Sequence, residues 1–416
     1  MLEFNYLRDK YPEFIYNGYT TSKEANSLKV TYSFEIKGLE NFYPEWTFPV
    51  NNSVKVDYEL LDNLVFSLGM VELISYWKAT CSPNVTIKPH GLNDDMISWW
   101  KSLYFDGLGE FFFVNGIETD VDSFMNITAT EMVFSRFEGE NNLDGVLVPI
   151  GGGKDSAVTL KILEKIKDKI LPFVINGREA TRMTCEVAGY KDISAIAKRT
   201  IDKNLLKLNS EGFLNGHTPF SAIVAFSSVI TALLNGKKYV VLSNESSANE
   251  STVQGQKVNH QFSKSEDFEN NFINYEEKYI NSGVSYFSLL RPLSEMQIAM
   301  LFSKYKEFHP VFKSCNVGSK KDIWCSNCPK CLFVYAILSP FLSSSELASI
   351  FGENLFEKKE NCEIRIEKIR FEIQQVESYP TSPINKKKLE RLDTELSLEY
   401  EALEYYKNLI FNLENN

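Results

Sequence analysis

The strongest constraint on the fold of this chain is a series of short apolar runs separated by segments of helical spacing. The series begins after Gly145, and its four runs cover residues 146–150, 171–175, 238–243 and 286–293. Residues 219–234 and 295–305 have the clearest helical spacing among the remaining segments. Short apolar strands that alternate with helices are typical of a parallel sheet with helices on both faces. The sequence therefore predicts an α/β fold whose ligand site lies at the carboxyl ends of the strands.

The region before this series has a mixed pattern. Apolar and polar residues alternate over residues 28–36, which predicts a half-buried strand. Residues 60–77 and 94–113 have helical spacing, and Asn93 is placed to cap the second of these helices. We therefore expect an N-terminal α+β domain over residues 1–140.

The end of the chain differs again. Its apolar residues fall at heptad spacing on both sides of a proline-containing break at residues 379–383, which predicts an antiparallel helical hairpin. Such a hairpin can pack on the body of the chain or join a second copy in a homo-oligomer. The predicted domains are thus the N-terminal domain, an α/β domain over residues 141–355 and a C-terminal hairpin over residues 356–416.

Charge and composition exclude several classes of protein. The chain has 416 residues, 44 Lys and Arg against 55 Asp and Glu, and a net charge of -11. An acidic chain lacks the basic field that binding to nucleic acid or to an anionic membrane requires. The longest apolar run, residues 220–234, is too short to span a bilayer, and residues 1–14 do not resemble a secretory signal. We expect a soluble, cytoplasmic protein.

A glycine loop follows the first apolar run of the α/β series. Three glycines allow a backbone to approach an anion closely, and the N-terminus of the next helix, predicted to start near Ser156, offers unpaired N–H groups. Lys154 can neutralise phosphate charge, Asp155 can hold Mg²⁺ or orient the loop, and Ser156 can donate to a phosphate oxygen. The alternative is a tight turn whose glycines serve packing alone. The predicted phosphate-binding residues are Gly151, Gly152, Gly153, Lys154, Asp155 and Ser156.

Four cysteines form a second candidate site. Cys315, Cys325, Cys328 and Cys331 have the spacing C-x9-C-x2-C-x2-C, which suits a tetrahedral structural zinc ion. An iron–sulfur cluster and a redox-active Cys-x-x-Cys pair are the alternatives. Three other cysteines are isolated in sequence and are predicted to be buried thiols: Cys81, Cys185 and Cys362.

Candidates for proton transfer and for anion binding follow the predicted strands. His217 precedes a helix for which Thr218 and Pro219 are the expected N-cap and first residue, and His260 follows the run at 238–243. Each histidine is either a general base or a structural residue. Glu245 can serve Mg²⁺, proton transfer or loop structure. Arg291 can bind a phosphate or substrate carboxylate, or close a surface ion pair.

The glycine loop resembles the PP-loop of the adenine-nucleotide alpha-hydrolase superfamily, whose pattern is Ser-Gly-Gly-x-Asp-Ser. Gly151 stands at the position of the first serine. The resemblance implies a parallel, Rossmann-like PP-loop sheet and cleavage of ATP to AMP and pyrophosphate while a carboxyl or carbonyl oxygen is adenylated. A similar set of four cysteines holds zinc in 7-cyano-7-deazaguanine synthase, another PP-loop enzyme.

Longer segments resemble one family, the ATP-dependent UDP-N-acetylmuramoyl-L-alanyl-L-glutamate epimerases of bacterial peptidoglycan synthesis. The resemblance covers most of residues 70–355 and does not extend beyond Leu355. The segments that carry it are 76–83 (YWKATCSP), 99–117, 148–156 (VPIGGGKDS), 215–223 (NGHTPFSAI), 242–251 (LSNESSANES), 258–269, 286–302, 314–316, 324–342 and 350–355.

This second resemblance implies an isomerase that uses ATP, Mg²⁺ and a structural zinc ion. The implied substrate is UDP-MurNAc-L-Ala-L-Glu, whose terminal carboxylate would be adenylated so that its Cα proton becomes acidic. The catalytic candidates are then Lys154, Asp155, His217, His260 and Glu245. The alternatives from other classes are a PP-loop enzyme like 7-cyano-7-deazaguanine synthase and a non-catalytic nucleotide-binding scaffold.

Overall fold

The structure is a computed structural model that describes residues 3–192, 194–249 and 261–357. The chain forms two compact units. Residues 1–314 with 319–322 belong to the first, and residues 315–318 with those from 323 onward belong to the second. The predicted C-terminal hairpin, the homo-oligomer through it, His260 and Cys362 lie outside the described residues.

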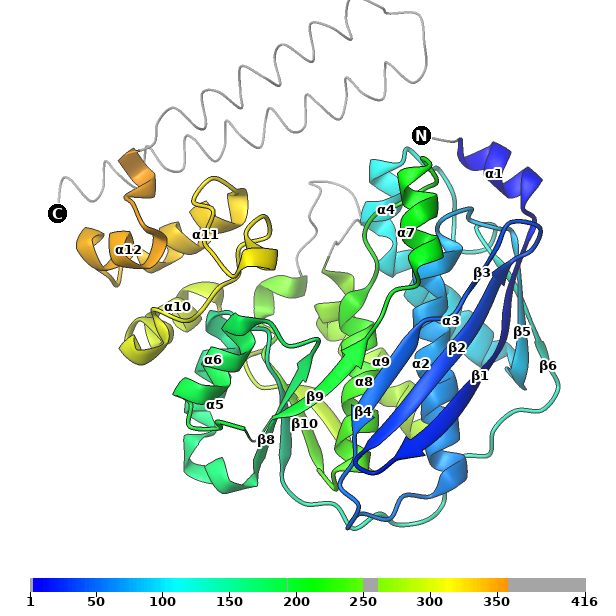
Figure 1. Cartoon of the computed structure of the whole chain (residues 1–416), viewed down its shortest axis with the longest axis horizontal. Helices are drawn as coiled ribbons and strands as arrows, with labels where there is room; N and C mark the ends of the chain where they lie inside the picture. The colour runs from blue at the N-terminus through cyan, green and yellow to red at the C-terminus, as the bar shows by residue number, and fades with distance from the viewer. Residues whose placement is uncertain (1–2, 193, 250–260, 358–416) are drawn as a thin grey trace, which may run out of the picture. The chain divides into compact units, whose positions relative to one another are not determined.

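The first unit is built on one large sheet (Figure 1). Over the described residues, ten strands pair in the order β11-β10-β7-β8-β9-β4-β2-β1-β5-β6, and β3 pairs with β2. The bounds of the strands are β1 Glu13–Glu24, β2 Ser27–Ile36, β3 Glu40–Phe42, β4 Glu45–Pro49, β5 Asn84–Gly91, β6 Asn126–Thr130, β7 Val146–Pro149, β8 Ile170–Ile175, β9 Ala195–Arg199, β10 Tyr239–Leu242 and β11 Ser285–Ser288.

The five strands from β7 to β11 are parallel, as the sequence predicts. Their order in the sheet reverses between β7 and β10, because β8 and β9 lie on one side of β7 while β10 and β11 lie on the other. Ligands of open parallel sheets bind at such a reversal, outside the carboxyl ends of the strands. The fold therefore puts the ends of β7 and β10 side by side.

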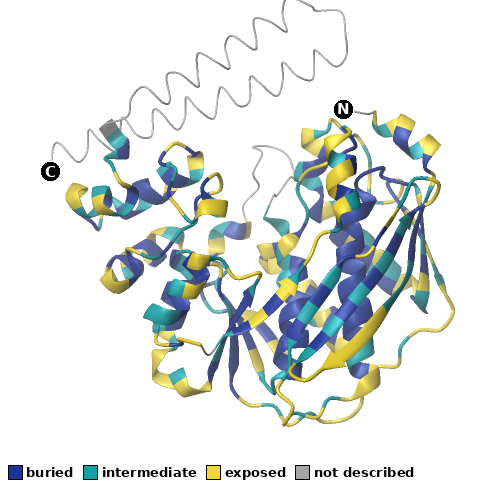
Figure 2. Ribbon diagram, in the orientation of Figure 1, coloured by how far each residue is buried: buried dark blue, intermediate teal, exposed yellow. Residues whose placement is uncertain are grey.

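Helices cover both faces of the parallel strands. Side chains alternate along β7, so that Leu147 shares a buried cluster with Phe226 of α8, while Val148 shares another with Leu160 of α5. Figure 2 shows that this part of the sheet is buried. The helices of the first unit are α1 Phe4–Lys10, α2 Tyr58–Trp77, α3 Asp94–Gly107, α4 Gly109–Val114, α5 Lys154–Ile162, α6 Glu179–Val187, α7 Lys203–Ser210, α8 Phe220–Leu234, α9 Glu266–Tyr279 and α10 Glu295–Ser303.

Short 3₁₀ helices connect several of these elements. They are η1 Glu164–Lys169, η2 Ser246–Asn249, η3 Phe262–Lys264, η4 Lys306–Phe308 and η5 Ser319–Lys321 in the first unit, and η6 Leu355–Glu357 in the second.

The N-terminal part of the sheet confirms the predicted alternation. Inward-facing residues of β2 are buried at every second position from Leu28 to Ile36. β4 then pairs antiparallel with β9, so the sheet continues from the N-terminal strands into the parallel strands. The predicted domain boundary at residues 140–141 falls in the connection between β6 and β7 and stays a prediction.

Helix α2 forms the centre of the unit. It packs against α8 and against β1 and β2, and it is buried on all sides from Asn63 to Trp77. Among the described helices, α2 is the one long and apolar enough to cross a membrane by length and composition, and 89% of the apolar window is buried inside the protein. The sequence did not show this segment as an apolar run because Asp62 and Glu72 interrupt it. Burial identifies α2 as a core helix.

Glu72 is fully buried in the middle of α2 and has charged and polar partners. Arg199, at the end of β9, donates from Nε and Nη2 to the two carboxylate oxygens at 2.5 and 2.7 Å, and Trp46 of β4 donates from Nε1 at 2.6 Å. A buried charge needs such pairing. The network therefore ties α2, β4 and β9 together where the two parts of the sheet meet.

The second unit is small and helical in its described part. Its helices are α11 Pro329–Leu338 and α12 Ser344–Phe351. A capping box between Ser343 and Glu346 starts α12, and Gly352 ends it in the left-handed conformation. Phe351 contacts the rings of Trp324 and Tyr335, with centroids 4.6 and 5.2 Å apart.

Several predicted boundaries need correction. Helix α5 begins at Lys154, two residues before the predicted start, and α8 begins at Phe220 with Pro219 as its N-cap, one residue later than predicted. The run at 286–293 ends as a strand at Ser288, since the chain turns there with Arg291 N–H donating to the Ser288 carbonyl at 3.4 Å. The predicted helix at 94–113 is divided into α3 and α4, and Asn93 caps α3 by accepting from Met96 N–H at 2.9 Å.

Candidate functional site

The glycine loop lies directly after β7 and leads into the N-terminus of α5. Gly152 has a φ of +81°, and a Cβ there would lie 3.1 Å from the backbone of Ala180 and Thr181 in α6. Both conditions require glycine. A Cβ on Gly151 would meet nothing within 4 Å, and Gly151 is exposed. The loop thus presents the backbone of Gly151 to solvent at the edge where β7 and β10 end.

Lys154 is held inside this edge by two carboxylates. Its side chain is 5% exposed, and its Nζ contacts both Asp155 and Glu295, the first residue of α10. Burial disfavours the ammonium charge, but the two carboxylates outweigh it, so the pKa of Lys154 lies above its usual value. Lys154 is therefore a fixed cation rather than a proton acceptor at neutral pH.

A third carboxylate joins the group from the loop after β10. Glu245 is buried, and Ser247 Oγ donates to its Oε1 at 2.9 Å. Burial raises the pKa of Glu295, and the nearby charges of Asp155 and Glu245 add to the rise. The structure thus brings Asp155 and Glu295 to one cation, and the charge of Glu245 acts on Glu295 from the loop after β10. Mg²⁺ is usually bound by one or two carboxylates together with substrate phosphates, which this arrangement can provide.

Ser156 and its neighbour on α5 have partners within this region. Ser156 Oγ donates to the Gly153 carbonyl at 3.1 Å, so the hydroxyl stabilises the loop. One turn later, Thr159 Oγ1 donates to Ser243 Oγ, just after β10, at 2.8 Å. These contacts fix α5 against the end of β10 and thereby fix the direction of the α5 N-terminus.

Three residues at this edge were not predicted from the sequence. Arg178, two residues beyond the Asn176 that follows β8, donates from Nη2 to the Gly151 carbonyl at 3.0 Å. Lys313 donates its backbone N–H to the Gly152 carbonyl at 2.8 Å. Glu295 contacts Lys154 as described. Arg178 could have been found, because a residue following a parallel strand lies at the ligand edge. Glu295 and Lys313 carry no signal of this kind.

Arg291 braces the loops around the site. It donates from Nη1 to the Glu245 carbonyl at 2.9 Å, and from Nη2 to the Lys264 carbonyl and to Glu269 Oε2, both at 2.8 Å. Its side chain is 12% exposed. The ion pair with Glu269 therefore holds the Arg291 guanidinium in place, and the guanidinium positions the backbone of Glu245.

His217 is distant from Lys154 in the sequence and lies just before α8. Its Nδ1 is 3.5 Å from Glu110 Oε2 of α4, and its side chain is 31% exposed. The neighbouring Gly216 carbonyl accepts from Lys78 Nζ at the end of α2. A carboxylate on Nδ1 orients an imidazole so that Nε2 can exchange protons. The structure thus adds Glu110 and Lys78, which sequence reasoning missed, to the surroundings of His217.

The four cysteines come together in the second unit. Their sulfur atoms all lie within 4.8 Å of one another. The pairs Cys315–Cys328 and Cys325–Cys331 are 3.8 Å apart, and Cys328–Cys331 is 3.5 Å apart. Thiolates about 2.3 Å from a single zinc ion at tetrahedral corners lie about 3.8 Å apart. A four-iron cluster needs a wider set, because each thiolate binds a different iron. The sulfur positions therefore fit one tetrahedral ion.

Backbone groups around Cys315 support this interpretation. Gly318 N–H donates to Cys315 Sγ at 3.0 Å, and Cys325 N–H does so at 3.5 Å. A Cβ on Gly318 would lie 2.2 Å from the Ile323 carbonyl oxygen, so only glycine fits. Such bonds orient a thiolate ligand and stabilise its charge. Outside the cluster, burial raises the pKa of the Cys81 and Cys185 thiols, which are predicted to be inert.

Two family models match the chain. Residues 5–289 match the MurL N-terminal domain, and residues 311–371 match the MurL C-terminal domain. The chain belongs to the MurL family. The glycine loop, His217 and Glu245 lie within the first match and the four cysteines within the second, while Glu295 lies in the interval between them.

Individual MurL relatives agree. A protein of Xanthomonas oryzae pv. oryzae is 35% identical over 298 residues, which cover 70% of this chain and 65% of the relative. One of Salinispora tropica is 32% identical over 329 residues, covering 76% and 70% respectively. Both are named UDP-N-acetyl-alpha-D-muramoyl-L-alanyl-L-glutamate epimerase. This chain spans about two thirds of the length of these relatives.

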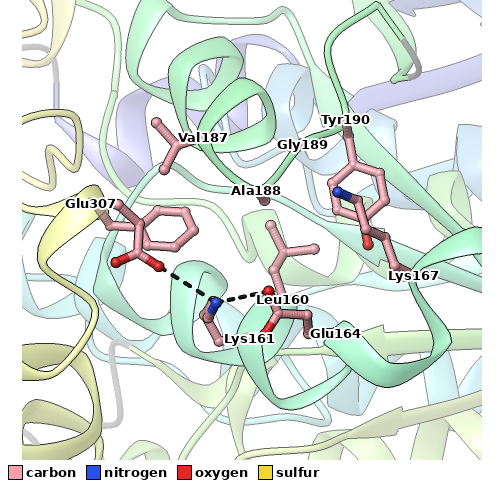
Figure 3. A pocket seen from close by; sticks show the side chains of 10 residues that line it. Leu160, Lys161, Glu164, Lys167, Val187, Ala188, Gly189, Tyr190 and Glu307 are labelled. Carbon is pink, nitrogen blue, oxygen red and sulfur yellow. Dashed lines mark hydrogen bonds and ion pairs between the residues drawn. The ribbon is translucent and has the colours of Figure 1, made fainter.

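The MurL chain also has a cavity of about 130 Å³ away from the glycine loop (Figure 3). It is lined by the end of α5, by η1, by the end of α6 and by η4. Lys161 Nζ lies there between Glu164 at 2.8 Å and Glu307 at 3.5 Å. None of the predicted site residues line it. Because the glycine loop precedes the other end of α5, this cavity is separate from the candidate site.

Proposed function

We propose that this chain is an ATP-dependent epimerase that converts the terminal L-glutamate of UDP-MurNAc-L-Ala-L-Glu to D-glutamate in the cytoplasm, during synthesis of peptidoglycan precursors. The names of the relatives support the epimerase role. The observation that carries the use of ATP is the glycine loop, exposed at Gly151, at the point where the strand order reverses, with Lys154 behind it. A glycine loop that leads from the end of a parallel strand into a helix N-terminus is suited to binding the phosphates of a nucleoside triphosphate, which supports the proposal.

The proposed chemistry has three steps. A carboxylate oxygen of the substrate attacks the α-phosphorus of ATP, and pyrophosphate leaves. The acyl-adenylate has lost the carboxylate charge, so a base can remove the Cα proton, and an acid can return a proton on the opposite face. Water then cleaves the adenylate to the free carboxylate and AMP. Cleavage of ATP provides the free energy for these three steps, which together invert the configuration at Cα.

The residues of the loop edge supply binding for ATP. The backbone of Gly151, Gly152 and Gly153 and the N-terminus of α5 would receive the phosphates, with Lys154 as the fixed cation behind them. Asp155 would hold Mg²⁺. Glu295 and Glu245 would assist, because the charges of Asp155 and Glu245 both act on Glu295. Mg²⁺ supplies neutralisation of the leaving pyrophosphate.

Proton transfer is assigned to polar residues of two loops, one before α8 and one after β10. His217 is the stronger candidate for a base, because the Glu110 carboxylate lies beside its Nδ1 and can orient the ring. Glu245 is a candidate for the opposite proton transfer if it is not engaged by Mg²⁺. His260 remains a candidate from its position after β10 in the sequence.

Cys315, Cys325, Cys328 and Cys331 would hold a structural zinc ion. The distances between the sulfur atoms support a single tetrahedral ion, and all four ligand positions are filled by protein, which is typical of structural rather than catalytic zinc. Metal analysis of the purified chain should return one equivalent of zinc. One equivalent of iron in its place would contradict the assignment.

The same four cysteines favour a second candidate, a PP-loop enzyme like 7-cyano-7-deazaguanine synthase, and a scaffold that binds nucleotide without turnover is the third. One assay separates the three. The chain is incubated in deuterated water with ATP·Mg²⁺ and UDP-MurNAc-L-Ala-L-Glu, and AMP, pyrophosphate and deuterium at Cα are measured.

The epimerase should form AMP and pyrophosphate, never ADP, and should introduce deuterium as L-glutamate becomes D-glutamate. Free glutamate should not react, because it lacks the contacts that position the carboxylate. Pyrophosphate without deuterium would leave an adenylating enzyme of another kind. ATP binding without pyrophosphate would favour the scaffold.

A further inference from the structure

Two lysines are buried among the described residues, and they differ in their partners. Lys154 has the carboxylates of Asp155 and Glu295 beside it. Lys78 is 6% exposed, and within the described part of the chain no carboxylate lies within ion-pair distance of its Nζ. Buried ammonium groups are normally paired. Lys78 therefore needs an explanation that Lys154 does not.

The structure places Lys78 under an exposed turn. It is the C-cap residue of α2, and its Nζ donates to the carbonyl of Gly216. Gly216 is exposed, and the turn continues into His217. Asn115 Nδ2 donates to the Asn215 carbonyl at 3.2 Å, which holds the other side of the turn. The ammonium thus binds the backbone of the residue directly before the histidine that we propose as a base.

Packing around the turn comes from three separate segments. Pro219 lies against Gly107 of α3, where a Cβ would come within 2.7 Å of the proline Cβ. Glu110 of α4 faces His217. Lys78, Gly107 and His217 thus come from the three segments 76–83, 99–117 and 215–223, each of which resembles the epimerase family. These segments meet in space at this turn.

A cation at this position costs stability, and the hydrogen bond to the Gly216 carbonyl offsets that cost only in part. Burial, with a smaller effect from the positive charge of Arg199, lowers the pKa of Lys78 to about 8. A methionine would fill the same space without a charge. A destabilising buried charge that a protein retains is a common mark of a binding or catalytic site.

We propose that Lys78 binds an anionic group of the substrate beside His217. This inference rests on the proposed function. After the α-carboxylate of the glutamyl residue is adenylated, the substrate carries three kinds of anion: the side-chain carboxylate of glutamate, the diphosphate of UDP and the phosphoryl group of the adenylate. The side-chain carboxylate fits best, because it is close to the Cα that His217 would deprotonate, while the glycine loop is proposed to bind the ATP-derived phosphate. Lys78 is then a residue that determines specificity for glutamate.

The test compares wild-type protein with Lys78→Gln and Lys78→Met on three substrates. These are UDP-MurNAc-L-Ala-L-Glu, the same compound with L-Gln in place of L-Glu, and MurNAc-L-Ala-L-Glu without UDP. Binding is measured by calorimetry and turnover by deuterium at Cα. The matched control is Lys101→Gln, since Lys101 also donates to a backbone carbonyl, that of Asp122 at 3.0 Å, but at the protein surface.

Wild-type protein should prefer the glutamate substrate over the glutamine substrate by at least tenfold, and Lys78→Gln should remove that preference without weakening glutamine binding. If Lys78→Gln instead removes the preference for UDP-MurNAc-L-Ala-L-Glu over MurNAc-L-Ala-L-Glu, Lys78 binds the diphosphate, and its assignment to the glutamate side chain is wrong. Thermal stability should be unchanged or higher in Lys78→Met, whereas a purely structural lysine would lower it. Unchanged preferences in both variants would overturn the inference while wild-type turnover keeps the proposed function. Absence of binding and turnover in wild-type protein would overturn both.

Discussion

The two candidate sites are built in opposite ways. The four cysteines lie within 17 residues of sequence, and short loops bring their sulfur atoms together. The glycine loop is short too, but its surroundings come from distant segments: Glu295 is 141 residues from Lys154. The difference teaches that a site made by local spacing can be recognised from sequence almost completely. A site whose residues come from distant parts of the chain can be recognised only at its local part, here the glycine loop.

The largest effect is expected from the local site. Cys328→Ser, or removal of metal by a chelator, should unfold the described part of the second unit, because the binding energy of a structural zinc ion is folding energy of roughly 10 kcal/mol in small domains. Thermal unfolding with metal analysis measures this. The first unit should keep its own transition.

A matched cysteine outside the cluster sharpens this result. Cys185→Ala truncates a buried side chain in the first unit and should cost about 1 kcal/mol with metal content unchanged. If Cys328→Ser behaves like Cys185→Ala, the cluster has no structural ion, and the contrast between the two sites disappears.

The assembled site should respond next to Lys154→Met. The change leaves Asp155 and Glu295, whose side chains are 36% and 20% exposed, near each other without a cation. Because water solvates both carboxylates in part, the expected cost is about 2–3 kcal/mol, below that of a fully buried pair. Calorimetry should also show that ATP binding is lost. Lys154→Arg keeps the charge and is the control, with partial recovery of stability.

The pH dependence of the same pair has a definite sign. The pKa of Lys154 is raised in the folded protein, so its contribution to stability is fully present below its unfolded pKa and is lost only in strongly alkaline solution. In Lys154→Met the stability should instead rise as the pH falls below neutral, because protonation relieves the repulsion between Asp155 and Glu295. Urea unfolding at a series of pH values measures both. A Lys154→Met protein whose stability falls as the pH drops below neutral would contradict the proposed charge arrangement.

These expectations also show where sequence reasoning ended. Strands β7, β8 and β10 were predicted because each is a continuous apolar run buried on both faces. Strand β9 was missed because Ile196 and Lys198 are exposed, so its residues do not form such a run. Glu110 and Glu295 were missed since only the folded chain brings them to His217 and Lys154. Spacing in the sequence identifies candidate site residues, whereas the folded arrangement of the strands and helices determines which distant residues become their partners.

A smaller effect should separate the glycines of the loop. Gly152→Ala forces a side chain into a φ of +81° and against the backbone of α6, which should cost about 1–3 kcal/mol. Gly151→Ala meets no atom within 4 Å and should leave stability unchanged. Chemical denaturation measures both variants. Equal stability of the two would mean that the loop does not need the left-handed conformation at residue 152.

The smallest effect is expected at the rim of the assembled site. Arg178 donates to the Gly151 carbonyl, and its side chain is 36% exposed, so Arg178→Gln should change stability by less than about 0.5 kcal/mol. If its guanidinium also contacts the ATP phosphates, the KM for ATP should rise about fivefold to tenfold with little change in kcat, since a rim charge contributes to ground-state and transition-state binding alike. Arg182→Gln is the control, because Arg182 is an exposed residue of α6 whose partners are Glu179 and Glu186. An equal KM for ATP in both variants would confine the phosphate site to the glycine loop and Lys154, which would make the assembled site more local than we infer.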